Sequence, residues 1–363
     1  MSFSLAGLGT AVPDAGLTVD EGLAVARCFG GPKLQQSGFL PAVYAGTGNR
    51  SRRQVLGRAV VDDVLNGTRL SGSPFLPDGS PDFCGPTTAG RMAKYAADAP
   101  PLAVQAARRA LLDGDTRPAD VTHLVTVSCT GFAAPGVDHA LITGLGLAPT
   151  VERVNVGFMG CHGAVNGLRV ANAFAADPAA RVLVCAVELC SIHYHYGDDP
   201  GQAVANALFA DGAAAVVGGQ CEGGWRLRAT GSCLIPNSAG AMSWTVGDRG
   251  FEMTLGRQVP GLIARHVRPW LDGWLRSLGL DVGAVGTWAV HPGGPRILSA
   301  VEEGLGLPAD ALGASRAVFA KYGNMSSPTV LFVLDRLRQA DAPRPCVMLG
   351  FGPGLTAEAA VWV

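Results

Sequence analysis

Three residues that lie far apart in this sequence, Cys161, His291 and Asn324, have the side-chain types of a nucleophilic acyl-transfer site. A cysteine thiolate attacks carbonyl groups and needs a base and a donor for the oxyanion that develops. In VNVGFMGCHGAVNGLRVAN (154–172), an apolar run stops at Gly-Cys-His-Gly and a helical pattern follows. A helix N-terminus there would favour a Cys161 thiolate. Taken alone, Cys161 is better explained as a core cysteine, because free cysteine is often buried.

His291 and Asn324 lie in segments suited to the same chemistry. In TWAVHPGGPRIL, His291 ends a predicted buried strand, at the sheet edge where open α/β folds have their sites. In isolation it could also be a core or surface histidine. In KYGNMSSPTVLFVLDRL, Asn324 directly precedes a predicted helix. Its amide could donate to an oxyanion or enolate, or it could cap the helix, with Pro328 tolerated in the first turn.

Three further segments give weaker signals. GFGPGLT (350–356) predicts a glycine turn between two terminal strands, and such a turn permits close approach of a ligand. The segment is not a dinucleotide-binding fingerprint, because no helix follows it. GNRSRRQVLGR (48–58) is a basic cluster, either a solvated face or a grip for phosphates. HYHYGDD (193–199) lacks a convincing ligand spacing, and we predict no metal site.

The elements that must position these residues alternate between strand and helix, which is typical of an α/β fold. We predict strands at 3–9, 123–129, 151–158, 180–189, within 206–219, at 287–292 and, as a pair, within 345–363. We predict helices at 101–114, 136–147, 162–177, 259–279, 294–306 and 324–339. Residues 31–99 are rich in Gly, Pro and Ser and are predicted to form active-site loops.

Composition excludes several classes of function. The 363 residues are 48% hydrophobic and carry a formal net charge of −1, which argues against binding to nucleic acid or to anionic membranes. Nine cysteines without a CxxC pair favour reduced thiols in the cytoplasm. No signal peptide is predicted, and no stretch approaches the roughly 18 apolar residues of a membrane span.

Together, the segments around Cys161, His291 and Asn324 resemble the chalcone synthase superfamily, the type III polyketide synthases. HPGGPRIL, YGNMSS and GFGPGLT are similar to signature segments of that family, and LAGLGTAVP, CTGFAAPG and ALFADGAAA extend the resemblance over the whole chain. VELCSIHY and SCTGF point to its bacterial branch. The family implies a thiolase fold, two similar α/β halves (here 1–225 and 226–363) in five αβαβα layers, and a homodimer.

The resemblance also implies a mechanism. Cys161 would be loaded from an acyl-CoA starter, and decarboxylative condensation with malonyl-CoA and cyclisation would follow. His291 as imidazolium would keep Cys161 a thiolate, and His291 and Asn324 would stabilise the oxyanion and the enolate. The family needs no metal or redox cofactor, only CoA thioesters as substrates.

Several other positions carry over from the family. Phe209 matches a phenylalanine that gates the junction of CoA tunnel and cavity, Met253 replaces a second gatekeeping phenylalanine, and Ala134 replaces a methionine that reaches into the partner's cavity. The predicted cavity-shaping residues are Cys129, His193, Trp244, Ser326, Gly352 and Pro353. The predicted CoA-phosphate ligands are Arg50, Arg52, Arg53 and Arg296.

The starter remains open at this stage. A cavity bordered by Ala134 and Met253 favours a fatty acyl chain, giving alkylpyrones or alkylresorcinols, whereas Trp244 and His193 could fill it and restrict the enzyme to small starters. A ketoacyl-carrier-protein synthase III shares the fold and the Cys-His-Asn set, but HPGGP and NMSS weigh against it. A silent thiolase-like partner subunit is the remaining alternative. Fast, selective iodoacetamide modification of Cys161 at neutral pH would argue against it.

Overall fold

The computed structural model describes residues 2–80, 82–221 and 223–363. Nine strands form a sheet in the order β11-β12-β13-β8-β1-β7-β6-β4-β5. Strand β1 joins two parts of this sheet, because it pairs along its length with β7 but with β8 only through Ser4 and Leu5. The strands of the sheet are β1 (Ser4–Ala11), β4 (His123–Ser128), β5 (Glu152–Gly157), β6 (Arg181–Leu189), β7 (Asp211–Gly219), β8 (Trp225–Leu234), β11 (Thr287–Val290), β12 (Cys346–Gly352) and β13 (Thr356–Trp362).

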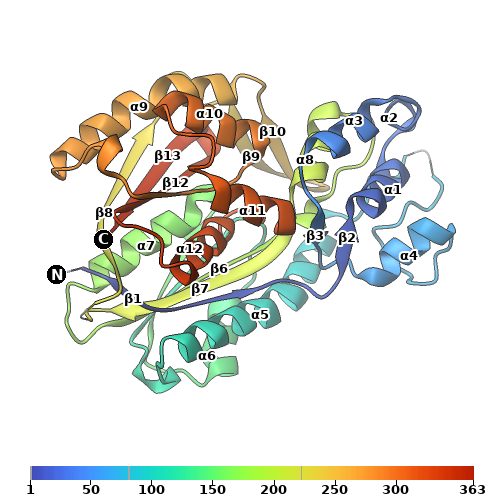
Figure 1. Ribbon diagram of the computed structural model, residues 1–363. Helices are drawn as coiled ribbons and strands as arrows, with labels where there is room; N and C mark the ends of the chain where they lie inside the picture. Colours follow the sequence, from blue (N-terminus) through green and yellow to red (C-terminus); the bar gives the residue numbers. More distant parts are fainter. Residues whose placement is uncertain (1, 81, 222) are drawn as a thin grey trace.

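Helices cover both outer faces of the two sheet parts and fill the space between them (Figure 1). The middle layer holds α7 (Gly163–Phe174) and α12 (Thr329–Gln339), whose apolar side chains pack against strands of both sheet parts. One outer layer holds α5 (Thr88–Asp113) and α6 (Val137–Leu145), and the other holds α9 (Val259–Ser277) and α10 (Pro295–Leu305). The predicted five-layer αβαβα arrangement is therefore confirmed.

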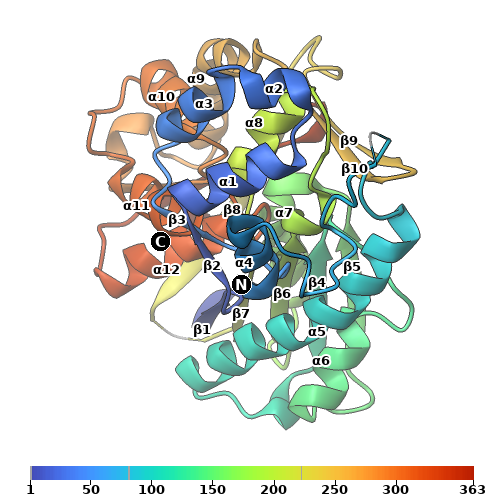
Figure 2. The same cartoon turned by 90° about the vertical axis from the view of Figure 1, so that its right-hand side faces the viewer.

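The remaining elements surround one side of the layered core. Figure 2 shows α1, α3 and α8 grouped there, and apolar side chains of these helices and of α2 form a small core of their own. These elements are β2 (Gly16–Thr18), α1 (Val19–Phe29), α2 (Pro32–Gln36), α3 (Phe39–Gly46), β3 (Ser51–Arg53), α4 (Arg58–Asn66), α8 (Pro200–Leu208), the hairpin β9 (Met242–Gly247) and β10 (Gly250–Leu255), and α11 (Gly313–Tyr322).

The predicted strands and helices listed above are all found, with shifted ends in several cases. The prediction of loops over 31–99 is wrong, because α2, α3, β3, α4 and the first turns of α5 lie there. Helix α5 begins at Thr88 and continues through Pro100 and Pro101, two residues that sequence rules treat as a helix boundary. A division of the chain at residue 225 remains a prediction.

Strand β5, which leads to Cys161, also differs from the prediction. The apolar run before Cys161 suggests burial, but this is an edge strand whose side chains are mostly exposed. Within the three described ranges, the structure contains no helix with the length and apolar character needed to cross a bilayer.

Candidate active site

Cys161 lies in a short 3-10 helix, η2 (Gly160–His162), between β5 and α7. The turn before it is tight: Phe158 and Gly160 both have positive φ angles, of 60° and 68°. A Cβ atom on Gly160 would lie only 2.4 Å from Cδ of Pro353, so only glycine fits this close approach. The thiol is thereby presented at the N-terminal end of α7, and the side chain is 6% exposed.

His291 follows β11 at the carboxyl end of the parallel β11–β12 pair. Its backbone N–H donates to Leu349 O at 2.7 Å, which extends the ladder by one residue and fixes the backbone at this position. The side chain is 1% exposed, and neither ring nitrogen has a hydrogen-bond partner among the described residues. A buried polar group without a partner costs free energy, so this arrangement suggests that the two nitrogens serve a ligand. Both nitrogens are free to bind a proton or a substrate.

Asn324 lies beside Phe209 in an isolated β-bridge, with Asn324 N–H donating to Leu208 O and Ala210 N–H donating to Asn324 O. The helix that follows begins only at Thr329, with Pro328 at its N-cap position. The reading of Asn324 as a helix cap is therefore wrong.

The side-chain amide of Asn324 is held at both ends. Its Oδ1 accepts from Ser326 N–H at 2.8 Å, and its Nδ2 donates to Gly293 O at 3.3 Å. An amide nitrogen carries two hydrogens, so a second donor remains.

Cys161, His291 and Asn324 line one small chamber, which we call the reaction chamber, together with Phe209, Met242, Met253, Leu255, Gly293, Ile297 and Phe351. A second, inner chamber adjoins it. Cys161, Phe209, Met242 and Met253 line both chambers, so the thiol lies where the two meet.

Aromatic side chains form one wall of the inner chamber. The rings of His193 and Phe251 are stacked with centroids 4.2 Å apart, and Trp244 meets both edge-on. Trp244 Nε1 donates to Cys129 O at 2.7 Å, and Phe251 N–H donates to His193 Nδ1 at 3.0 Å. Burial lowers the pKa of His193 to about 3, so this ring is neutral and donates from Nε2 to Thr130 O. The chamber holds about 40 Å³, room for only a few water molecules.

Burial governs the electrostatics of the candidate nucleophile and base. It raises the pKa of the Cys161 thiol to about 11, against the effect of Ser326 and Asn324, and it lowers the pKa of His291 to about 3. Either charge alone is thus disfavoured here. Transfer of the thiol proton to His291 creates both charges together, and their attraction offsets part of the desolvation.

We predict that replacing His291 with alanine changes how alkylation of Cys161 depends on pH. Without the imidazole, Cys161 is a buried thiol whose pKa is raised, so its reaction with iodoacetamide should increase about tenfold per pH unit between pH 7 and pH 10. If His291 accepts the thiol proton in the unmodified protein, the proton stays within the pair and the rate should be nearly constant around neutral pH. Mass spectrometry of the Cys161 peptide measures both profiles, and identical profiles would contradict the pairing.

The structure places the predicted cavity residues in two groups. Cys129, His193, Trp244, Ser326 and Pro353 line the inner chamber. Ala134 lines a separate hollow beside β4 and β5, outside both chambers.

Gly352 is buried but lines neither chamber. A Cβ atom there would lie 2.4 Å from Cδ2 of His162. The close approach that its missing side chain permits is therefore to this ring and not to a ligand.

The predicted CoA-phosphate ligands divide in a similar way. Arg52 is 6% exposed and donates to the carbonyl groups of Asn206 and Phe209, so its assignment to a CoA phosphate is wrong. It stabilises the C-terminal end of α8 instead. Arg53 donates to Asp14 O and lines a surface groove away from Cys161, whereas Arg50 and Arg296 are exposed.

Sequence reasoning missed several residues of the site. Met242 and Phe251 line the chambers from the β9–β10 hairpin, which had no clear strand signal. Glu188 is fully buried, and its carboxylate accepts from the backbone of Cys129 and from the Ser327 hydroxyl. Burial raises its pKa. A single charged residue in the apolar run VLVCAVEL (182–189) was a usable signal for it.

The described residues contain no group of three or more His, Cys, Asp or Glu side chains arranged to hold a metal ion. The arrangement of thiol, imidazole and carboxamide around one small, buried chamber suits covalent acyl transfer with stabilisation of a developing oxyanion.

Comparison with known proteins gives concordant matches. Residues 80–221 match the family model for the N-terminal domain of chalcone and stilbene synthases, and residues 226–363 match the model for the C-terminal domain. The alpha-pyrone synthesis polyketide synthase-like Pks18 of Mycobacterium tuberculosis is 38% identical over 74% of this chain and 71% of its own. Bisdemethoxycurcumin synthase of Oryza sativa is 40% identical over 73% and 71%.

Solved structures agree with these sequence matches. PKS-I of the brown alga Ectocarpus siliculosus superposes with a TM-score of 0.89 and 32% identity, covering 100% of this chain and 98% of that one. The C-terminal type III polyketide synthase domain of Steely1 from Dictyostelium superposes with a TM-score of 0.87 and 28% identity, covering 100% and 99%.

Proposed function

This chain belongs to the chalcone and stilbene synthase family and is a type III polyketide synthase with the thiolase fold. From that premise, we propose how its own residues carry out the reaction. Cys161 is the nucleophile, His291 the base and oxyanion donor, and Asn324 a second donor. The carrying observation is that all three line the reaction chamber, while both nitrogens of His291 lack partners within the described part of the chain.

In the loading step, His291 takes the thiol proton and the Cys161 sulfur attacks the carbonyl carbon of an acyl-CoA. The tetrahedral intermediate places its charge on the former carbonyl oxygen, where Asn324 and protonated His291 can donate hydrogen bonds. Collapse of the intermediate breaks the bond to the CoA sulfur, which leaves with the proton from His291. The acyl group is then a thioester on Cys161.

In the extension step, malonyl-CoA loses carbon dioxide and its electron pair forms an enolate, whose oxygen meets the same two donors. The enolate carbon attacks the acyl-enzyme carbonyl and expels the Cys161 thiolate, which forms a 3-ketoacyl-CoA. A dry chamber protects the enolate from protonation before it reacts. Repetition, and attack of an enol oxygen on the thioester carbonyl with loss of CoA, would yield a pyrone. CoA thioesters are the only cosubstrates in this scheme.

The size of the inner chamber supports a short acyl starter. Trp244 and His193 line this narrow chamber, and each is held in place by a hydrogen bond to the loop 129–130. Of the two alternatives left by the sequence, the small starter therefore has the better support. A pyrone product is supported by the likeness to Pks18, which is named for alpha-pyrone synthesis.

The experiment that tests the proposed function is product analysis by mass spectrometry. Purified protein would be given malonyl-CoA with acyl-CoA starters from acetyl to palmitoyl, beside the Cys161→Ala variant. We expect a cyclised polyketide that is absent with the variant. Activity only with a malonyl-carrier protein would instead indicate a ketoacyl-carrier-protein synthase III-like enzyme, and no activity with either would indicate a silent partner subunit.

We predict that Trp244→Ala widens the range of starters. Removing the indole opens the inner chamber, so turnover with dodecanoyl-CoA relative to butanoyl-CoA should increase roughly tenfold or more, as expected for a lost steric barrier of 1–3 kcal/mol. Competition assays with both starters measure this ratio. Trp270→Ala, on α9, serves as the control and should leave the ratio unchanged. An unchanged ratio in Trp244→Ala would show that the indole does not limit the starter.

We further propose that the protein is a cytoplasmic homodimer that associates through the β5 edge. Phe132, Val154 and Met159 are 54%, 37% and 44% exposed, and all belong to β5 or to loops beside it. Exposed apolar groups of this kind mark association sites. Ala134 lies in the hollow beside β5, so a second copy would cover it.

We predict that Met159→Glu weakens this association. A buried, unpaired carboxylate costs several kcal/mol, so the dissociation constant should increase at least about hundredfold. Analytical ultracentrifugation measures it, and Leu70→Glu, at an exposed residue near α4, is the control. A Met159→Glu protein with unchanged mass in solution would place the interface elsewhere.

The CoA phosphates have two remaining candidates. Arg50 and Arg296 are exposed, and guanidinium groups form paired hydrogen bonds with phosphate. We propose these two residues, without Arg52 and Arg53, as the phosphate ligands of the acyl-CoA.

A further inference from the structure

His162 is a buried titratable side chain directly after the proposed nucleophile, and the mechanism above does not use it. It ends the 3-10 helix that carries Cys161, stands at the N-cap position of α7, and is 4% exposed. It does not line either chamber, so it cannot touch the substrate. Any part it has in the reaction must act through its neighbours.

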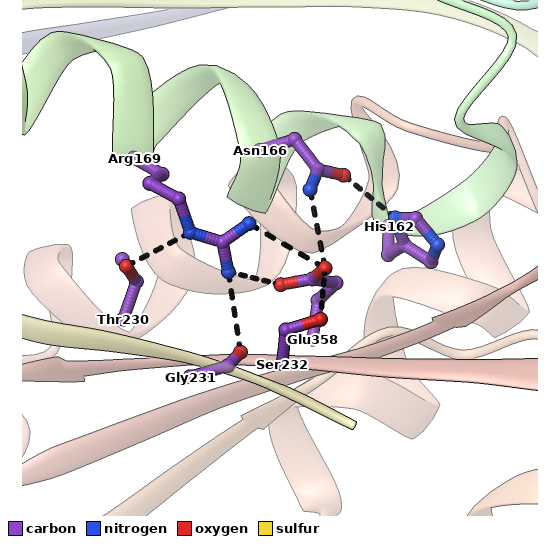
Figure 3. Close-up of polar contacts among 7 residues, drawn as sticks. All are labelled: His162, Asn166, Arg169, Thr230, Gly231, Ser232 and Glu358. Atoms are coloured by element: carbon purple, nitrogen blue, oxygen red, sulfur yellow. Dashed lines mark hydrogen bonds and ion pairs between the residues drawn. The ribbon is translucent and has the colours of Figure 1, made fainter. Parts of the chain in front are cut away.

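One edge of the His162 ring is fixed by a chain of polar contacts (Figure 3). Nδ1 lies 2.7 Å from Oδ1 of Asn166, one turn further along α7, and Asn166 Nδ2 donates to Glu358 Oε1 at 3.2 Å. Glu358, on β13, is 3% exposed and pairs with Arg169 of α7, and it also accepts from the Ser232 hydroxyl at 2.8 Å. We call these five residues the His162 network.

The network selects one tautomer of the neutral ring. An ionised Glu358 only accepts hydrogen bonds, so the amide nitrogen of Asn166 must face it and the amide oxygen must face His162. Nδ1 of His162 therefore carries the hydrogen, and Nε2 carries none. Burial lowers the pKa of His162, against the effects of Asn166 and Glu358, which keeps the ring neutral at pH 7.

The opposite edge of the ring lies against the turn that closes the inner chamber. Ideal Cβ atoms on Gly350 and Gly352 would lie 3.2 Å from Cβ and 2.4 Å from Cδ2 of His162. The next residue, Pro353, lines the inner chamber and lies against Gly160. The Gly352–Pro353 turn thus touches the Cys161 turn at Gly160 and the His162 ring at Gly352, so a change in the angle of the ring would move both turns.

We infer that His162 is a positioning residue: the chain from Arg169 and Glu358 through Asn166 locks its ring, and the ring holds the Cys161 turn and the Gly352–Pro353 turn in register. Because α7 belongs to the middle layer and Glu358 and Ser232 belong to β13 and β8, the lock also ties the nucleophile to the other sheet part. Burial lowers the pKa of His291 first, and a positive charge on His162 would lower it further. A neutral His162 ring therefore leaves His291 better able to accept the thiol proton. This inference rests on the proposed role of Cys161.

The test compares His162→Phe and Glu358→Gln with the unmodified protein. Phenylalanine keeps a ring against Gly352 but cannot bond to Asn166, so the thiol should be misplaced and kcat should fall roughly 10- to 100-fold. The KM for the acyl-CoA starter should stay within about twofold, because the ring does not line the chambers. Glu358→Gln should lower kcat less, by about threefold to tenfold. His123→Phe, at the far end of β4, is the matched control and should change neither constant.

A second readout needs no folded variant at position 162. The ¹⁵N spectrum of histidine-labelled protein reports which ring nitrogen is protonated. We expect the Nδ1–H tautomer for His162 in the unmodified protein and a mixture in Glu358→Gln. An Nε2–H tautomer, or a kcat for His162→Phe equal to that of His123→Phe, would overturn the inference. If no starter gives a polyketide, the proposed function fails, while the tautomer and the alkylation rate of Cys161 still decide the role of His162.

Discussion

Cys161→Ala is expected to abolish formation of the acyl-enzyme and, with it, all product. Two other cysteines, Cys129 and Cys190, line the inner chamber, but only Cys161 also lines the reaction chamber with His291 and Asn324. Burial raises the pKa of Cys129 and of Cys190 far above the ordinary range, so neither forms a thiolate at neutral pH. Alanine at position 161 leaves no thiol that a base can reach, and the reaction has no other covalent route.

Intact-protein mass spectrometry after brief exposure to an acyl-CoA measures the adduct. The unmodified protein should gain the mass of one acyl group, Cys161→Ala should gain none, and Cys129→Ala and Cys190→Ala should both retain it. Those two variants are matched controls, because each removes a buried thiol from the same chamber wall. An adduct on the Cys161→Ala protein, located by peptide mapping at Cys129 or Cys190, would move the nucleophile to that residue.

The layered fold could be predicted from the sequence because buried strands and amphipathic helices leave strong periodic patterns. The run HLVTVSC and the helix beginning at Val259 are examples in which local pattern and tertiary structure agree. The pattern failed where packing overrides local preference. Helix α5 runs through Pro100 and Pro101 because its length is fixed by the core that it covers, and the apolar residues of β5 serve an exposed edge.

The candidate site was predictable where the residue type itself limits the chemistry. Few arrangements explain Cys161, His291 and Asn324 at the ends of predicted elements, and the structure does bring them to one chamber. The arginines show the opposite case. A guanidinium can bind a phosphate or cap a helix with the same donors, and only the three-dimensional path of the chain shows that Arg52 lies under α8.

The spacing of His162, Asn166 and Arg169 on one face of a predicted helix is visible in the sequence. The network as a whole could not have been predicted, because no spacing rule joins these residues to Ser232 on β8 and Glu358 on β13. A histidine next to a candidate nucleophile is visible in GCHG, but its tautomer depends on Glu358, almost two hundred residues later. Local sequence therefore identifies the reacting groups, whereas the contacts that hold them depend on the tertiary fold.

Asn324→Ala is expected to remove most of the condensation activity while loading of Cys161 survives. The amide of Asn324 is oriented by Ser326 N–H and by Gly293 O, which leaves one N–H of Nδ2 directed at neither. A donor fixed in this way stabilises a developing oxyanion without reorganisation, and losing one typically costs a factor of about 100 to 1,000 in rate. Formation of the enolate depends on the Asn324 donor more than loading does, because the negative charge of the enolate persists until the enolate carbon attacks the acyl-enzyme.

Asn324→Asp is the informative second variant. It keeps the size of the side chain and an oxygen that accepts from Ser326 N–H, but it replaces the donor with a group that repels an enolate. It should therefore lose condensation at least as severely as alanine does, although its fold is retained. Malonyl-CoA decarboxylation and product formation, measured beside the mass of the acyl-enzyme, separate the two steps. The Asn324 side chain does not cap α12, which begins only at Thr329, so a loss of activity in both variants cannot be attributed to a frayed helix. Full turnover by Asn324→Asp would instead show that His291 alone supports the enolate.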